Sequence, residues 1–166
     1  MRKLCFTALL FCLMLLSVFG CSGSQIKTVQ KTQLEIRQMQ TRTYDTQNTK
    51  MVVKAMLNVL QDDGFIVNQA DLELGFLNAT KEVDVENPWE KFWATYEEGW
   101  KKNSITTCTA NVSQFGDKTR VRVNFQVKVM TNLGGVATVY QIDDPEYYQK
   151  FFSKVDKGIF IEKEKI

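Results

Sequence analysis

The feature that most constrains the fold is a strictly alternating segment in the second half of the chain. From Arg120 to Val129, valine or phenylalanine stands at every odd position and a polar side chain at every even position. Successive side chains of a β-strand point to opposite faces of the sheet, so this segment has one apolar and one polar face. It predicts a strand of an antiparallel sheet that other elements cover on one face only.

Other segments of the chain supply neighbours for this strand. The residues just before it predict a hairpin partner, because only a Gly–Asp turn separates the two segments. Short apolar or loosely alternating segments, bounded by turn residues, predict four more strands. The hairpin partner covers residues 105–115, and the four further strands are residues 32–43, 65–67, 76–82 and 136–142.

Three segments instead repeat apolar residues every three or four positions, which is the spacing of one face of an α-helix. In the first, Asp45 is the expected N-cap and Gly64 the expected stop. The second begins at the cap residue Asn87, which is followed directly by a proline, and the third begins at Asp144, also followed by a proline. The predicted helices cover residues 45–63, 87–100 and 144–159.

The order of these elements predicts an α+β fold. A strand, a helix, two strands, a helix, three strands and a helix follow one another, and an antiparallel sheet with helices packed on one face satisfies this order. We expect one domain over residues 32–166, preceded by a polar tether over residues 21–31.

The first twenty residues have the pattern of an export signal. Arg2 and Lys3 precede an uncharged apolar core at residues 4–19, which is shorter than the roughly 20 residues of a membrane-spanning helix. The core ends in Val-Phe-Gly-Cys, which resembles a lipobox, and this resemblance implies a signal peptide at residues 1–20 and lipidation of Cys21. An ordinary secretory signal cut near Gly20 and a retained N-terminal helix are the alternatives.

The lipobox resemblance also implies a location. Diacylglycerol and a further acyl group, such as palmitate, on Cys21 would bury enough methylenes to hold the protein permanently in a membrane. The residue after the cysteine is Ser22, whereas an aspartate at this position would favour retention at the inner membrane. By resemblance to enterobacterial sorting, we expect a Gram-negative lipoprotein in the outer membrane, facing the periplasm.

Charge and cysteine content limit the remaining possibilities. The chain has 21 basic and 19 acidic residues; Arg2 and Lys3 leave with the signal, so the mature chain has 19 of each and no net charge. Without a basic cluster we expect no binding of nucleic acid. Two of the four cysteines lie in the signal and Cys21 carries lipid, which leaves Cys108 as a buried strand residue rather than a reactive thiol.

The sequence offers no set of catalytic residues. It contains no histidine, no glycine-rich phosphate loop and no nucleophile elbow. Carboxylate pairs occur at 62–63, 97–98 and 143–144, but neighbours in sequence do not define a cleft. Asp62 and Asp63 stand where a helix dipole disfavours them, which is mildly suggestive of a surface contact. We expect no enzyme, no metal and no cofactor.

The unusual feature is an aromatic stripe on the predicted helix at 87–100. Spacings of three, four, seven and eleven residues would place its members on one helical face. Two interpretations stay open: the rings fill the core between helix and sheet, or they form a binding face for a partner or ligand. The members of this stripe are Trp89, Phe92, Trp93, Tyr96 and Trp100.

Three segments carry a resemblance to known proteins. They are residues 57–65 (LNVLQDDGF), 74–81 (LGFLNATK) and 144–160 (DPEYYQKFFSKVDKGIF). The chain resembles a group of uncharacterised Gram-negative lipoproteins and, more distantly, the helix-grip domains of BamC, a lipoprotein of the outer-membrane β-barrel assembly machinery. The resemblance implies a helix laid across an antiparallel sheet with a groove for a protein or ligand. The aromatic stripe is not part of it, and no functional residue is carried over.

These observations together predict a non-enzymatic binding or accessory module of the cell envelope, anchored through lipid and contacting envelope proteins. The alternative is a carrier or sensor of a small apolar ligand held in a groove between helix and sheet. The identity of the partner or ligand and the oligomeric state stay open at this point.

Overall fold

The computed structural model describes residues 31–94 and 99–164, with the exception of the side chain of Trp93. The predicted signal peptide, Cys21 and most of the predicted tether lie outside these residues. The elements are α2 (Gln33–Met39), β1 (Thr41–Tyr44), α3 (Thr49–Asp62), β2 (Ile66–Asp71), β3 (Phe76–Asp84), α4 (Pro88–Trp93), β4 (Lys101–Phe115), β5 (Lys118–Thr131), β6 (Val136–Gln141) and α5 (Pro145–Glu164).

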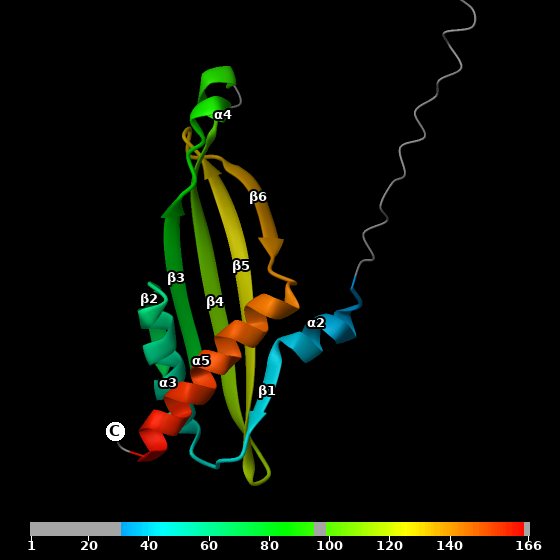
Figure 1. Cartoon of the computed structure of the whole chain (residues 1–166), viewed down its shortest axis with the longest axis vertical. Helices are drawn as coiled ribbons and strands as arrows, with labels where there is room; N and C mark the ends of the chain where they lie inside the picture. The colour runs from blue at the N-terminus through cyan, green and yellow to red at the C-terminus, as the bar shows by residue number, and fades with distance from the viewer. Residues whose placement is uncertain (1–30, 95–98, 165–166) are drawn as a thin grey trace, which may run out of the picture. The chain divides into compact units, whose positions relative to one another are not determined.

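The strands form one six-stranded antiparallel sheet, with α3 and α5 lying across one of its faces (Figure 1). The strand order is β1-β5-β4-β3-β2, and β6 also pairs with β5. Both β1 and β6 use the same edge of β5: β1 pairs with residues 119–122 and β6 with residues 126–130. The predicted α+β class and antiparallel sheet are confirmed.

The core lies between the two long helices and the sheet. Val121, Val123 and Phe125 on β5 are at most 1% exposed, so the alternating strand has the buried face that its sequence predicts. The stripes of α3 and α5 are buried against it, because an apolar helical face is stabilised only when another apolar surface covers it. Cys108 lies in this core on β4 without any exposure, and burial raises its thiol pKa to about 12, as expected of a structural cysteine.

The first segment of the domain differs from the prediction. Residues 32–43 were expected to form one strand, but residues 33–39 form α2 and only Thr41–Tyr44 pair with β5. The reason is local: Thr32 and Glu35 form a capping box, in which each side chain accepts a hydrogen bond from the other residue's backbone N–H. None of the residues of α2 is buried. Its sequence therefore has no need of the apolar stripe by which a helix is predicted.

The start of α3 also differs from the prediction. Its N-cap is Asn48, whose Oδ1 accepts a hydrogen bond from Met51 N at 3.0 Å, and not Asp45. Asp45 instead forms an ion pair with Lys118 at 2.7 Å. Gly64, with a φ of 81°, follows the end of the helix as predicted, because glycine adopts this left-handed conformation without steric cost.

The edge of β5 has a gap where β1 and β6 meet, and Tyr148 of α5 fills it. The Tyr148 hydroxyl donates to Ile142 O at 3.1 Å and lies 3.4 Å from Phe125 N, which donates to it. Gln40, only 2% exposed, donates from Nε2 to the same hydroxyl at 3.4 Å. One side chain therefore joins α5, β5, the end of β6 and the start of β1.

We predict that Tyr148→Phe lowers the free energy of unfolding by about 1–3 kcal/mol, because it leaves buried backbone and amide groups without a partner. Tyr44→Phe is the matched control. The Tyr44 hydroxyl is also buried, but within residues 31–94 and 99–164 it has no hydrogen-bond partner, so its removal is expected to be neutral or slightly stabilising. Urea unfolding of the two variants measures the difference, and equal losses would contradict the role of Tyr148.

Candidate binding site

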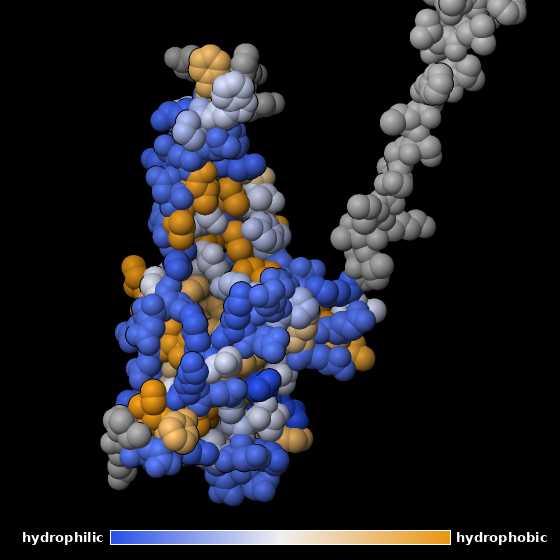
Figure 2. All heavy atoms as spheres, in the orientation of Figure 1, coloured by the Kyte–Doolittle hydropathy of each residue, from blue (hydrophilic) through white to orange (hydrophobic). Residues whose placement is uncertain are grey.

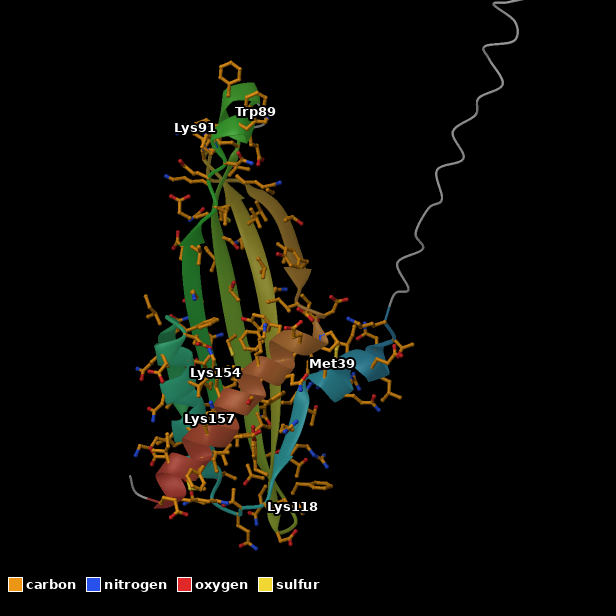
Figure 3. All side chains as sticks on the ribbon, viewed as in Figure 1. Met39, Trp89, Lys91, Lys118, Lys154 and Lys157 are labelled. Atoms are coloured by element: carbon orange, nitrogen blue, oxygen red, sulfur yellow. The ribbon has the colours of Figure 1, made fainter. Side chains whose placement is uncertain are left out.

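The long β3–β4 hairpin carries α4 at its end, beyond the region that α3 and α5 cover (Figures 1 and 3). Asn87 caps α4 as predicted, with its Oδ1 accepting from Trp89 N at 3.0 Å. Trp89 is 70% exposed and Phe92 is 72% exposed. Their rings stack with centroids 6.3 Å apart and an interplanar angle of 25°. We call Trp89, Phe92 and Trp100 the aromatic tip.

Trp100 fixes the aromatic tip to the end of the sheet. Its backbone N donates to Asn132 Oδ1 at 2.8 Å, which links the start of β4 to the loop after β5. Its indole Nε1 lies 3.5 Å from Glu86 Oε1, and Lys91 Nζ stands 5.0 Å from its ring centroid. Trp100 is half-buried and is linked to both ends of the hairpin tip through Glu86 and Lys91.

The aromatic stripe does not lie on one helix, which corrects the prediction for residues 87–100. Ala94 has extended backbone angles and ends α4 after Trp93, and Gly99 has a φ of 65° immediately before β4 begins. A Cβ at Gly99 would lie 2.3 Å from Asn132 Oδ1, so the chain needs glycine to make this approach. Tyr96 and the side chain of Trp93 lie outside the described residues.

The interpretation of the stripe as core is wrong for Trp89 and Phe92. The covered half of the sheet is already filled by α3 and α5, whose apolar residues are buried there. The hairpin extends past this core and carries α4 away from it (Figure 1). The two rings lie outside this core and are largely exposed.

The paired carboxylates have structural roles where the structure describes them. Asp63 ends α3 and forms an ion pair with Lys154 of α5. Asp144 accepts from Glu146 N at 2.9 Å at the start of α5. Glu97 and Glu98 lie outside the described residues. Within the described ranges, no group of three or more cysteines and carboxylates is arranged to hold a metal ion.

The helix-bearing face has a cleft of about 330 Å³ between α5 and strands β3 and β4. Aromatic side chains make much of its lining, and burial raises the pKa of Tyr147 among them to about 12. Three lysines surround it, each in contact with an acidic residue or a carbonyl: Lys154 with Asp63, Lys81 with Asp63 O at 2.6 Å, and Lys150 with Glu146 at 2.8 Å.

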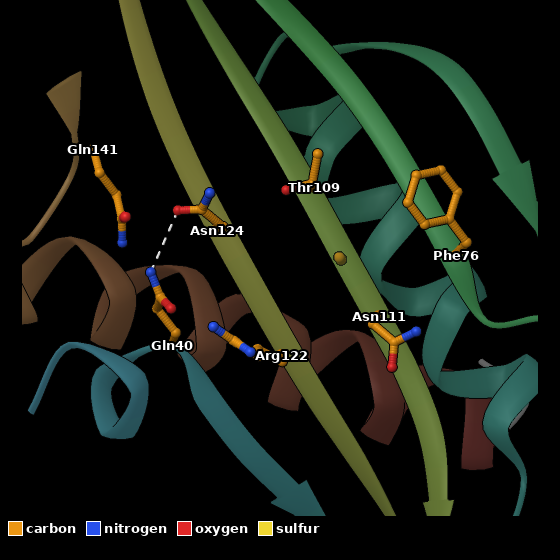
Figure 4. A pocket seen from close by; sticks show the side chains of 8 residues that line it. Gln40, Phe76, Thr109, Asn111, Arg122, Asn124 and Gln141 are labelled. Atoms are coloured by element: carbon orange, nitrogen blue, oxygen red, sulfur yellow. Dashed lines mark hydrogen bonds between the residues drawn. The ribbon is translucent and has the colours of Figure 1, made fainter. Parts of the chain in front are cut away.

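A second hollow lies on the opposite, polar face of the sheet and was not expected from the sequence (Figure 4). It has a volume of about 420 Å³ and combines amide side chains with Arg122 and Phe76. Gln40 Nε2 donates to Asn124 Oδ1 at 3.3 Å across one side of it. The polar positions of β5 predicted a solvent-exposed face of the sheet. The hollow itself also depends on Gln40 and Gln141, which come from distant segments.

No helix among residues 31–94 and 99–164 combines the length and apolar character needed to span a bilayer.

Comparison with known proteins gives few points of reference. No family model matches the chain, and no curated protein matches it. Among solved structures, the chain is similar to a DUF4468 family protein from Bacteroides ovatus, with a TM-score of 0.42 and 8% identity over 72% of this chain and 84% of that one.

Proposed function

We propose that this protein is a non-enzymatic binding or accessory module of the Gram-negative envelope, held at the outer membrane by lipid on Cys21 and facing the periplasm. In this proposal the aromatic tip contacts an envelope protein. The observation that carries it is the 70% and 72% exposure of Trp89 and Phe92 at the end of a projecting hairpin. Membership of a lipoprotein family distantly similar to BamC is part of the proposal and rests on the sequence segments given above.

The chemistry of the aromatic tip favours a protein partner. Large aromatic side chains dominate the binding energy of protein interfaces when a partner buries them at the centre of a contact. Here ion pairs surround them, with Lys91 at 3.7 Å from Glu86 and Lys101 at 3.8 Å from Glu90. The aromatic rings with these ion pairs around them form the apolar centre and polar rim typical of a protein–protein contact. Each pair joins one basic and one acidic residue, so this surface lacks the excess of basic residues typical of a nucleic-acid site.

We predict that replacing Trp89 by a photoreactive phenylalanine analogue yields a defined crosslinked species in intact cells. The matched control places the same analogue at Phe160, which is 60% exposed on α5, far from the aromatic tip in the sequence. The second arm is the double variant Trp89→Ala, Phe92→Ala, which should reduce copurification of the crosslinked protein at least tenfold without changing the unfolding midpoint. Equal crosslinking from both positions would contradict the proposal.

The anchor has a separate test. We predict that Cys21→Ser removes labelled fatty acid from the protein and moves it from the outer-membrane fraction to the soluble periplasmic fraction, because the acyl chains supply the membrane affinity. Ser22→Ala is the control and should keep both the label and the membrane location. If parent and Cys21→Ser chains fractionate alike and neither carries fatty acid, the protein is an ordinary exported domain.

A second candidate function is supported by the cleft under α5. Its volume of about 330 Å³ and its aromatic lining suit a small apolar ligand, so the domain would act as a carrier or sensor. With palmitate as the probe, native mass spectrometry should show one bound molecule, and Thr106→Phe, which fills the cleft, should weaken binding at least tenfold. Serine at the same position is the control. Absence of a palmitate complex in the parent chain would remove this candidate.

A further inference from the structure

The strand β6 forms an open edge of the sheet. It pairs with β5 on one side, and all six of its residues are exposed, with Val136, Val139 and Tyr140 at 50–52%. Its sequence, VATVYQ, contains no charge and no proline. An edge of this kind presents unpaired backbone N–H and C=O groups, which are the groups that another extended segment needs for pairing.

The other free edges of the sheet have features that oppose pairing. In β2 the register is interrupted between Val67 and Gln69, and Asn68 there bonds to Asn78 and Thr80 of β3. In β1 the edge residue Arg42 carries a charge and pairs with Asp156 at 3.3 Å. Bulges and charges are the usual means by which proteins prevent pairing at sheet edges. Among the strands described here, β6 is the edge without a charge. Its own register shifts between Thr138 and Val136, so its regular part is residues 138–141.

The direction of the β6 backbone groups follows from its pairing with β5. Ile142 N donates to Phe125 O at 2.9 Å, and these residues continue the register in which Tyr140 lies opposite Val127. In an antiparallel pair, alternate residues direct their N–H and C=O groups to the partner strand. Tyr140 and Thr138 therefore face β5, and the backbone groups of Val139 and Gln141 face outward.

The surroundings of β6 define the side chains of a suitable partner strand. On the helix-bearing face, Thr138 and Tyr140 lie beside Val129 and Val127, and Figure 2 shows apolar side chains on this uncovered half of the sheet. On the opposite face, Lys128 is the register partner of Val139, and it is exposed. No ion pair involves Lys128 within the described part of the chain. An incoming strand would thus meet an apolar surface on one face and a positive charge on the other.

We propose that the edge of β6 is a second docking surface, which binds an extended segment of a partner protein by β-strand addition. The segment alternates apolar side chains, which cover Thr138 and Tyr140, with acidic side chains on the face of Lys128. Backbone hydrogen bonds to Val139 and Gln141 supply the affinity, and the alternation supplies the specificity. This surface does not involve the aromatic tip, so the proposal does not rest on the proposed function.

Two synthetic peptides test this proposal on the whole mature protein. The probe is a capped heptapeptide that alternates valine and glutamate, and the matched control alternates valine and lysine. We expect the first to bind and to protect the amide hydrogens of Val139 and Gln141 from exchange, and the second to bind at least tenfold more weakly. Lys128→Glu should reverse this preference.

Proline substitutions separate the edge from the fold. Val139→Pro removes an outward-facing N–H, so it should abolish binding of the valine–glutamate peptide and leave thermal unfolding unchanged. Thr138→Pro removes an N–H directed to β5 and should lower the unfolding midpoint. If Val139→Pro also destabilises the protein, Gln141→Pro takes its place as the blocking variant. Binding that survives both outward substitutions, binding with protection elsewhere, or protection of β6 by self-association without peptide would each overturn the proposal.

Discussion

The structure depends on the way Tyr148 closes the gap between two strands that share one edge of β5. Its hydroxyl bridges the backbone of Phe125 and Ile142, and it also receives Gln40 at the start of β1. Besides this bridge, the long α5 helix contacts the sheet mainly through apolar packing, which has no directional preference, and through the exposed ion pair of Arg42 with Asp156. The bridge instead sets where β6 ends and where α5 begins.

The parts of the fold that the sequence predicted are those in which burial and periodicity agree. The alternation of β5 and the stripes of α3 and α5 were readable because each places its apolar residues on the single face that becomes buried. The short α2 was missed because a capping box holds it and none of its residues is buried. The sequence pattern that indicates α2 is Thr32 followed three residues later by Glu35, and this pattern involves only two side chains.

The candidate site was predictable in composition but not in geometry. The clustering of Trp89 and Phe92 was visible, but their exposure depends on how far the β3–β4 hairpin extends past the core, which is a property of the whole sheet. Likewise, the end of α4 and the position of Trp100 depend on Gly99 and on Asn132, which lies 32 residues along the chain from Trp100. Pattern rules within one segment carry no information on such distant contacts.

On this account, Trp89 and Phe92 of the aromatic tip lie exposed to solvent until a partner covers them. A variant with Trp93→Phe and Trp100→Phe leaves Trp89 as the single tryptophan, so its fluorescence reports on this position directly. Acrylamide quenching in the isolated protein should approach that of free tryptophan amide, with emission at the long wavelengths of an indole in water. Weak quenching with blue-shifted emission, as for a tryptophan in a packed core, would contradict the account.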